Sequence, residues 1–390
     1  MKKHLFVFIF FLVACQISDK TANLPHPKSP EQQAQDRFIQ QFETRFKAQL
    51  AASKCPGAAV VIVRDSTVVF EKGFGLRSSK TRDSVDVHTV FRLASLSKGF
   101  TGVLAAKIVS EGLMNWDETV KRIIPAFTLS DAGQAGRVTI RHLLSHSSGL
   151  PRHAYTNLIE AGETIDEIIP QFRNVKLIAK EGQVFAYQNA AFAIIEKVLQ
   201  KKTGIAFPDL ITRNLFQPAG MKDASASYAG IVSNPDIAQP HKWNAADSAY
   251  HPVPITERYY NTASAGGINA SIHDMGIWLQ VLLGNRPEVV PLSAIDDAFT
   301  PEVASENENR YFRWDGVTSS SYGFGWRIFQ FEGRELVYHG GYVNDFRTEI
   351  AIDRTNKVGI CVLFNAPNDM ASTVIPDFFR AYWNKDVPEQ

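Results

Sequence analysis

Strand-like segments at both ends of the chain enclose a middle of helical character, and this pattern limits the possible folds most strongly. Residues 58–64 and 67–75 are rich in Val, Phe and Ala, and the Asp65-Ser66 pair between them predicts a hairpin. Four short apolar runs separated by turn residues occur near the other end, at 325–331, 335–339, 347–352 and 358–363. We therefore predict one antiparallel sheet built from both ends of the chain.

The residues between these two regions show the periodicity of helices. Apolar side chains recur at helical spacing in five segments, 117–124, 139–144, 164–172, 190–201 and 274–283. An amphipathic helix from about 371 to 383 closes the chain. The predicted fold class is α+β with two lobes. One lobe, from residues 36–92 and 320–390, holds an antiparallel sheet flanked by helices, and the other, from residues 93–319, is mostly helical.

A serine and a lysine are suitably spaced for nucleophilic chemistry in Ser95-Leu96-Ser97-Lys98. On a helix, residues three apart share a face, so the lysine amine can approach the serine hydroxyl. A serine hydroxyl becomes a good nucleophile only when another group removes its proton. The pKa of a lysine can shift in a poorly solvated cleft, and such a lysine can help to remove the serine proton. This S-x-x-K occurs once in the chain and opens the apolar run 103–113, which puts Ser95 near the positive end of a helix dipole.

Tyr187 and Asn189 form the best placed of five Y-x-N tripeptides in the chain. They follow the glycine-containing loop 181–183 and directly precede the predicted helix 190–201, so both side chains can point into a cleft. A tyrosine there can relay protons if nearby cations lower its pKa. The alternative is a core tyrosine followed by an asparagine that caps the helix.

A third motif, His339-Gly340-Gly341, ends a predicted strand. Two glycines allow a substrate backbone to approach the strand edge closely. The alternative is an ordinary tight turn with an exposed histidine.

Taken together and in this order, the motifs resemble those of the serine β-lactamase and penicillin-binding-protein superfamily, in particular its class C β-lactamase-like branch. Three further segments carry the resemblance, at 56–58, 139–151 and 265–271, and the third motif contributes to it within 338–341. The resemblance implies that Ser95 is the acylated nucleophile, Lys98 its proton partner and Tyr187 the general base and acid. It also implies that Asn189 binds a substrate amide and that the backbone N–H groups of Ser95 and Tyr342 form the oxyanion hole. Whether Lys98 or Tyr187 takes the serine proton stays open.

The third motif departs from the class C pattern, which has K-T-G where this chain has H-G-G. A lysine would be a permanent cation for a substrate carboxylate, whereas His339 is cationic only when its pKa permits. The histidine form resembles that of some D-peptidases and esterases. Arg347, on the next predicted strand, could supply the missing charge, or it could be a solvated strand residue. The predicted substrate-binding residues are Asn189, His339, Gly340, Gly341, Tyr342 and Arg347.

These residues predict a serine hydrolase that cleaves an amide or ester through an acyl-serine intermediate. The histidine motif favours a D-amino-acid peptidase or carboxypeptidase, or an esterase, with a small molecule or a cell-wall-derived peptide as substrate. One alternative is a class C-type β-lactamase. Another is a catalytically silent peptidoglycan-binding protein, although the intact set of Ser95, Lys98 and Tyr187 argues against it.

The first residues predict an envelope location. Lys2 and Lys3 precede an apolar run, residues 5–14, that has the length of a signal-peptide core and is too short to span a bilayer. Residues 12–15, Leu-Val-Ala-Cys, resemble a bacterial lipobox. We therefore expect residues 1–14 to be a signal peptide, Cys15 to carry a lipid anchor, and residues 15–35 to form a flexible tether. Gln16 favours the outer membrane, facing the periplasm. The alternative is an ordinary secretory signal.

Several other functions find no support in the sequence. The 41 basic and 40 acidic residues nearly balance, without a basic patch for nucleic acid. His142 and His146 stand four apart, but the glutamate of H-E-x-x-H is absent, so we expect no metal. No phosphate-binding glycine loop or dinucleotide motif is present, and we expect no cofactor. Cys55 and Cys361 read as buried free thiols, with a disulfide between them as the alternative.

Overall fold

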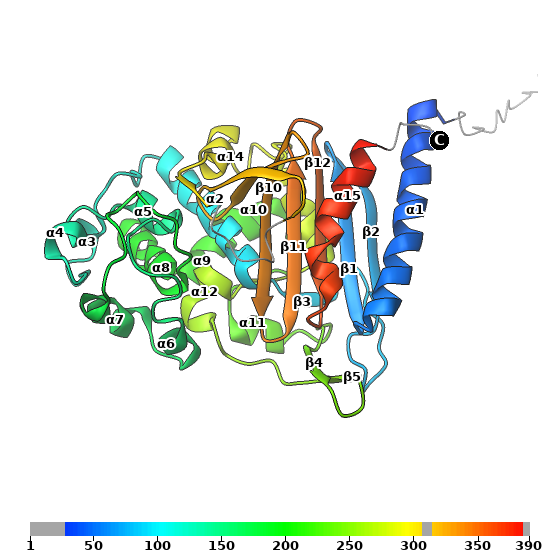
Figure 1. Ribbon diagram of the computed structural model, residues 1–390, viewed down its shortest axis with the longest axis horizontal. Helices are drawn as coiled ribbons and strands as arrows, with labels where there is room; N and C mark the ends of the chain where they lie inside the picture. Colours follow the sequence, from blue (N-terminus) through cyan, green and yellow to red (C-terminus); the bar gives the residue numbers. More distant parts are fainter. Residues whose placement is uncertain (1–27, 306–313, 385–390) are drawn as a thin grey trace, which may run out of the picture.

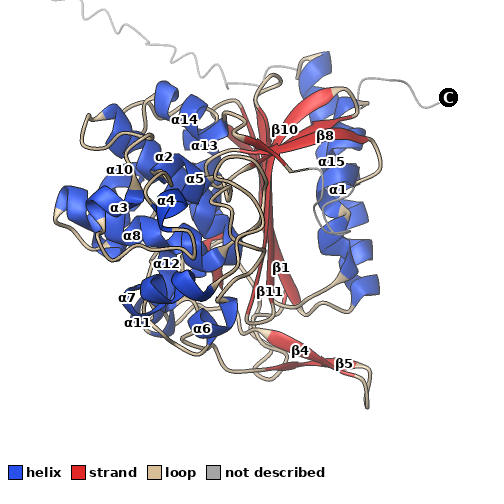
Figure 2. Ribbon diagram, turned by 60° about the vertical axis from the view of Figure 1, so that its left-hand side comes forward, coloured by secondary structure: helices blue, strands red, loops and turns tan. Residues whose placement is uncertain are grey.

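The computed structural model describes residues 28–305 and 314–384, which form a central antiparallel sheet between two helical layers (Figures 1 and 2). Among these residues the sheet has eight strands in the order β2-β1-β12-β11-β10-β9-β8-β7. Their bounds are β1 (Gly57–Arg64), β2 (Thr67–Gly75), β7 (Val303–Ala304), β8 (Val317–Tyr322), β9 (Arg327–Phe331), β10 (Arg334–Val343), β11 (Phe346–Asp353) and β12 (Val358–Phe364). Because β1 pairs with β12, with Val61 opposite Cys361, the sheet joins both ends of the chain as predicted.

Two long helices cover one face of the sheet, α1 (Pro30–Ser53) and α15 (Val374–Trp383) (Figure 2). α1 begins where Ser29 and Gln32 form a capping box, and Pro30 fits its first turn. Its buried residues recur every four positions and form one apolar stripe: Phe38, Phe42, Phe46 and Leu50. The Phe42 ring meets the Phe378 ring of α15 edge to face, at 5.5 Å between centroids.

The helical lobe covers the other face and has α2 (Ser97–Ser110) at its centre. α2 is buried along most of its length, so it is apolar on nearly every side rather than amphipathic. The longer helices around it are α8 (Asn189–Thr203), α13 (Ile272–Leu282) and α14 (Leu292–Phe299). The shorter ones include η1 (Ala94–Leu96), α3 (Val120–Ile123), α4 (Ala132–Ala135), α5 (Ile140–Leu144), α6 (Thr156–Glu160), α7 (Ile165–Ile168), η2 (Ile169–Asn174), α9 (Phe207–Ile211), α11 (Tyr228–Val232), η4 (Tyr260–Thr262) and α12 (Ala263–Gly266).

Two small sheets complete the architecture. β3 (Val90–Arg92) pairs with β6 (Asn269–Ser271) inside the helical lobe. β4 (His241–Asn244) and β5 (Ala249–Pro252) form a hairpin that projects from the body of the molecule at the lower edge of Figure 1. The fold is the predicted α+β arrangement.

The predicted lobe boundaries need three adjustments. The expected tether does not extend to residue 35, because α1 already begins at Pro30. The sheet lobe resumes at Val303 instead of 320, since β7 and β8 are strands of the large sheet. β8 contains Thr318-Ser319-Ser320-Ser321 near the sheet edge and is half exposed. It therefore lacks the run of apolar residues on which the strand prediction relied. β3 belongs with the helical lobe rather than the large sheet.

Cys55 and Cys361 are both buried and both free, so the alternative of a disulfide between them does not hold. The reason is geometric: Cys55 packs in the core beneath α1 and α15, whereas Cys361 packs in the core on the helical-lobe face. No helix in the described residues has the length and apolar character required to cross a bilayer. The predicted signal peptide and Cys15 lie outside the described residues.

Candidate active site

Ser95, Lys98 and Tyr187 meet at the start of α2. Ser95 lies in η1, and Lys98 follows in the first turn of α2. The Lys98 Nζ atom is 3.3 Å from the Ser95 Oγ atom, and the Tyr187 hydroxyl donates a hydrogen bond to the same Oγ atom at 2.9 Å. The S-x-x-K and Y-x-N motifs, separated by about ninety residues of chain, therefore converge on one hydroxyl.

Lys98 is fully buried, and its ammonium group faces acceptors on two other elements. It donates to the Asn189 Oδ1 atom of α8 at 2.8 Å and to the Ala265 carbonyl of α12 at 2.7 Å. Burial lowers the pKa of Lys98 well below its usual value, and the positive charge of Arg327 lowers it further. A buried lysine of this kind can exist as a neutral amine, which can accept a proton.

His146 supports the loop that carries Tyr187. The backbone N–H of Gln188 donates to the His146 Nδ1 atom at 3.2 Å, and the N–H of Ala186 donates to the His146 carbonyl at 2.9 Å. The His146 and Tyr187 rings lie 4.4 Å apart between centroids. Burial, and then the charge of Lys98, hold the pKa of His146 well below its usual value, so the ring is neutral. The described residues contain no group of three or more side chains suited to a metal ion.

His339 does not occupy the position expected from the sequence, and its predicted role as a substrate ligand needs correction. The side chain is fully buried and does not line the pocket around Ser95. Its Nδ1–H donates to the Gly340 carbonyl at 2.9 Å, so its Nε2 atom is an acceptor for the Tyr322 hydroxyl at 3.0 Å and for an Arg327 N–H at 3.3 Å. Burial first, and then the charge of Arg327, keep the pKa of His339 well below its usual value. His339 therefore orients Arg327 instead of supplying a charge itself.

Arg327, at the start of β9, is the permanent cation that the third motif lacks. It lines the same pocket as Ser95, and its guanidinium lies 5.5 Å from the centroid of the Tyr187 ring. The sequence analysis missed it, although a signal was present. The turn at Glu332-Gly333 defines a hairpin whose register puts Arg327 opposite Tyr338, the neighbour of His339.

Arg347, the residue predicted to supply this charge, also lines the pocket. Side chains alternate along β11, and the Thr348 hydroxyl points toward the helical lobe, where it donates to the Leu93 carbonyl at 2.8 Å. Arg347 therefore points to the opposite face, where its guanidinium stacks on the Tyr342 ring at 4.9 Å. Tyr342 is half exposed, and its hydroxyl donates to the Asp345 carboxylate at 3.3 Å.

Gly341 allows β10 to run against η1. A Cβ atom on Gly341 would lie 2.2 Å from the Thr348 Oγ1 atom, 2.8 Å from the Leu93 carbonyl and 3.0 Å from the Ala94 Cβ atom. Only glycine permits this approach. The contact brings Gly340, Gly341 and Tyr342 into the lining of the pocket beside Ser95, where the backbone N–H groups predicted for the oxyanion hole would be required.

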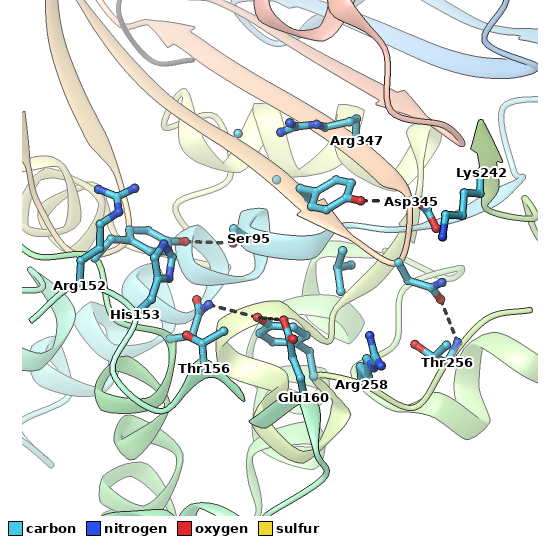
Figure 3. Close-up of a pocket in the computed structure, with 18 of the residues that line it drawn as sticks. Ser95, Arg152, His153, Thr156, Glu160, Lys242, Thr256, Arg258, Asp345 and Arg347 are labelled. Carbon is cyan, nitrogen blue, oxygen red and sulfur yellow. Dashed lines mark hydrogen bonds between the residues drawn. The ribbon is translucent and has the colours of Figure 1, made fainter. Parts of the chain in front are cut away.

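The pocket has a volume of about 730 Å³, and part of its lining comes from segments that carry no recognisable motif (Figure 3). Besides the predicted residues Ser95, Tyr187, Asn189, Gly340, Gly341, Tyr342 and Arg347, its lining includes Arg152, His153, Glu160, Lys242, Arg258, Tyr259 and Arg327. Tyr259 links two walls, since its hydroxyl approaches both the Asn189 amide and the Glu160 carboxylate at 3.3 Å. These additional lining residues come from separate helices, strands and loops, so they could not have been assigned to one pocket before the fold was known.

A buried lysine, a serine and a tyrosine in a cleft between a helical lobe and an antiparallel sheet define the serine β-lactamase and penicillin-binding-protein class. The chain belongs to the Beta-lactamase family, whose model matches residues 42–380. The octameric penicillin-binding protein homologue from Pyrococcus abyssi is similar in structure, with a TM-score of 0.75 and 25% identity over 88% of this chain and 77% of that one.

Curated relatives match at lower identity. The unguisins hydrolase ungD' of Aspergillus campestris is 24% identical over 326 residues, which cover 81% of this chain and 60% of that protein. Protein flp of Staphylococcus aureus is 23% identical over 338 residues, which cover 86% of this chain and 65% of that protein. The chain thus spans less than two thirds of the length of these two relatives.

Proposed function

We propose that the chain is a serine hydrolase that cleaves an amide or ester bond through an acyl intermediate on Ser95. The observation that carries this proposal is the position of the Ser95 Oγ atom, 2.9 Å from the Tyr187 hydroxyl and 3.3 Å from the Lys98 amine. Covalent catalysis requires a nucleophile within hydrogen-bond reach of a base, and other groups must hold that base in place.

The hydrogen bonds of Lys98 suggest a route for the serine proton. The Asn189 and Ala265 oxygens can only accept, so they take two N–H bonds of the amine. In the neutral amine, the lone pair is then left to face Ser95. As the Oγ atom bonds to the substrate carbonyl carbon, its proton passes to Lys98. Tyr187 donates a proton to the departing amine or alcohol and recovers one from Lys98. Water then attacks the acyl ester by the reverse route and releases the acid.

The site favours a substrate with a carboxylate near the scissile bond. Arg327 is a permanent cation beside Tyr187, the proposed proton donor to the leaving group. A carboxylate on the leaving group fits a carboxypeptidase acting on a D-amino-acid peptide, and an ester of a hydroxy acid would present the same charge. One curated relative is named as a hydrolase, which agrees with this reaction class. A β-lactamase remains the alternative, because a β-lactam offers the same amide and carboxylate.

Steady-state turnover of three donors tests the proposal: a p-nitrophenyl ester, a peptide ending in two D-alanines, and a chromogenic cephalosporin. We expect turnover of the ester or the peptide, with a loss of at least about a thousandfold in Ser95→Ala. Ser110→Ala, an exposed serine at the far end of the same helix, should leave the rate unchanged. Fastest turnover of the cephalosporin would favour the β-lactamase alternative. Absence of turnover with all three donors would favour the silent binding protein.

We also propose that the protein is anchored in the bacterial envelope through lipid on Cys15, on the support of the signal-peptide and lipobox patterns alone. Growth of cells expressing the full chain with an alkyne fatty acid should label the wild-type protein and not Cys15→Ser. An unlabelled wild-type protein, cut at another position, would instead support an ordinary secretory signal.

A further inference from the structure

We propose that the acyl portion of the substrate carries a negatively charged group and that Lys242 and Arg258 bind it. This inference rests on the proposed acyl transfer to Ser95 and adds the substrate class. The two cations come from separate elements, the β4 strand and the loop before η4, and both line the pocket that contains Ser95 (Figure 3).

Within the part of the chain that the structure describes, neither cation has a partner for its charge. In the ranges 28–305 and 314–384, neither Lys242 nor Arg258 forms an ion pair or a side-chain hydrogen bond, while many of the other lysines and arginines pair with carboxylates: Arg137 with Glu181, Arg141 with Glu302 and Lys202 with Glu118 are examples. Two unpaired cations facing one pocket repel each other weakly, and a bound anion would relieve that repulsion.

The balance of charge in the pocket points the same way. Its lining has five lysine and arginine residues and two carboxylates, whereas the chain as a whole is nearly balanced, with 41 basic and 40 acidic residues. Both carboxylates already accept a hydrogen bond from a tyrosine, Glu160 from Tyr259 and Asp345 from Tyr342. Asp345 lies on the same side of the pocket as Lys242 without pairing with it, so it weakens the local positive potential but does not cancel it.

The backbone that carries Arg258 is held by buried groups. Arg92 is fully buried and donates to the Thr256 carbonyl at 3.0 Å and to the Arg258 carbonyl. The backbone N–H of Thr256 donates to the Asn344 side chain at 2.8 Å. These bonds fix the loop against β3 and the β10–β11 turn. A ligand that binds Arg258 therefore orders one side chain rather than a whole loop.

The position of the proton donor indicates which part of the substrate meets these cations. Tyr187 must reach the leaving atom to protonate it, so the leaving group lies on the Tyr187 side of Ser95. His153 packs against Tyr187 at 5.8 Å between centroids. In Figure 3, Arg152 and His153 lie on one side of Ser95, and Lys242, Thr256 and Arg258 lie on the other. The portion that stays on Ser95 after the leaving group departs therefore extends toward Lys242 and Arg258.

The test compares esters that share one leaving group and differ only in charge on the acyl chain. The p-nitrophenyl monoester of glutaric acid has an anionic acyl chain, and its methyl ester is a neutral counterpart of similar length. We expect wild type to prefer the anionic ester by about tenfold in kcat/KM, from two partly exposed charge pairs. High salt should shrink this preference. The double variant Lys242→Gln with Arg258→Gln should remove it, because kcat/KM should fall more for the anionic ester than for the neutral one.

Lys80→Gln, which removes a cation from a separate groove, is the matched control and should keep the preference. Equal kcat/KM for both esters in wild type, or an unchanged preference in the double variant, would overturn the inference while leaving the serine hydrolase intact. If no ester is turned over, calorimetric binding of the two esters to Ser95→Ala decides the question separately. Tighter binding of the anionic ester to Ser95→Ala, lost when Lys242→Gln and Arg258→Gln are added to it, would support the charged subsite, and equal binding of the two esters would reject it.

Discussion

At the scale of single residues, the site depends on a lysine that must be neutral to act as a base. Burial lowers the pKa of Lys98, so its neutral form is present above that lowered pKa and is lost as the pH falls through it. We predict that kcat/KM for an ester falls about tenfold per pH unit on the acid side of the profile. Lys98→Met should remove this limb along with most of the activity. An acid limb that persists in Lys98→Met would show that another group sets it.

Arg327 gives a second prediction at this scale, because its charge contributes to the lowered pKa of Lys98. Removing a nearby positive charge favours protonated lysine, so Arg327→Gln should move the acid limb to higher pH. Arg327→Lys, which keeps the charge, should leave the limb near its original position. Arg327→Gln should also raise KM for substrates with a carboxylate on the leaving group more than for uncharged ones. An unshifted limb in Arg327→Gln would contradict this coupling.

At the scale of elements, the contact between β10 and η1 sets the position of Ser95 relative to the pocket wall. A methyl group in Gly341→Ala would collide with Leu93 and Thr348, and we predict a loss of about 1–3 kcal/mol in the free energy of unfolding, with slower acylation. Gly136→Ala is the matched control, since its nearest neighbouring atom would be 3.4 Å away and its φ is −71°. That variant should keep its stability within about 0.5 kcal/mol. Thermal unfolding and ester turnover measure both effects, and equal behaviour of the two variants would refute the role of this contact.

At the scale of the whole molecule, α1 covers the sheet lobe and is part of the fold. Each of its three buried phenylalanines contributes about 1.5–3 kcal/mol through burial against the sheet and α15. A chain that begins at Lys28 should unfold at the same temperature as a longer one. A chain that begins at Lys54 should fail to fold or should melt at a much lower temperature. Circular dichroism and calorimetry check this, and equal melting temperatures would show that α1 is dispensable.

The features that could be predicted from the sequence are those encoded by local residue patterns and by the order of the motifs along the chain. Ser95 with Lys98, and Tyr187 with Asn189, are short motifs on or beside helices. Their local spacing therefore predicted, before the fold was known, that Lys98 approaches Ser95 and that Tyr187 and Asn189 point into a cleft. The His339 motif was found, but its role was wrong, because burial by Arg327 and Tyr322 depends on strand pairing. Lys242 and Arg258 lie in segments that only the tertiary fold brings to Ser95, and no periodicity or motif marks them.

The most direct test of the account is acid-quenched intact mass spectrometry during the first turnovers, with a penicillin and with an activated p-nitrophenyl ester, followed by peptide mapping. The account predicts one acyl group per wild-type chain with at least one of the two donors, mapped to Ser95, absent in Ser95→Ala and formed much more slowly in Lys98→Met. An acyl group on another residue, the same adduct in Ser95→Ala, or no adduct with either donor would contradict the assignment of Ser95 as the nucleophile.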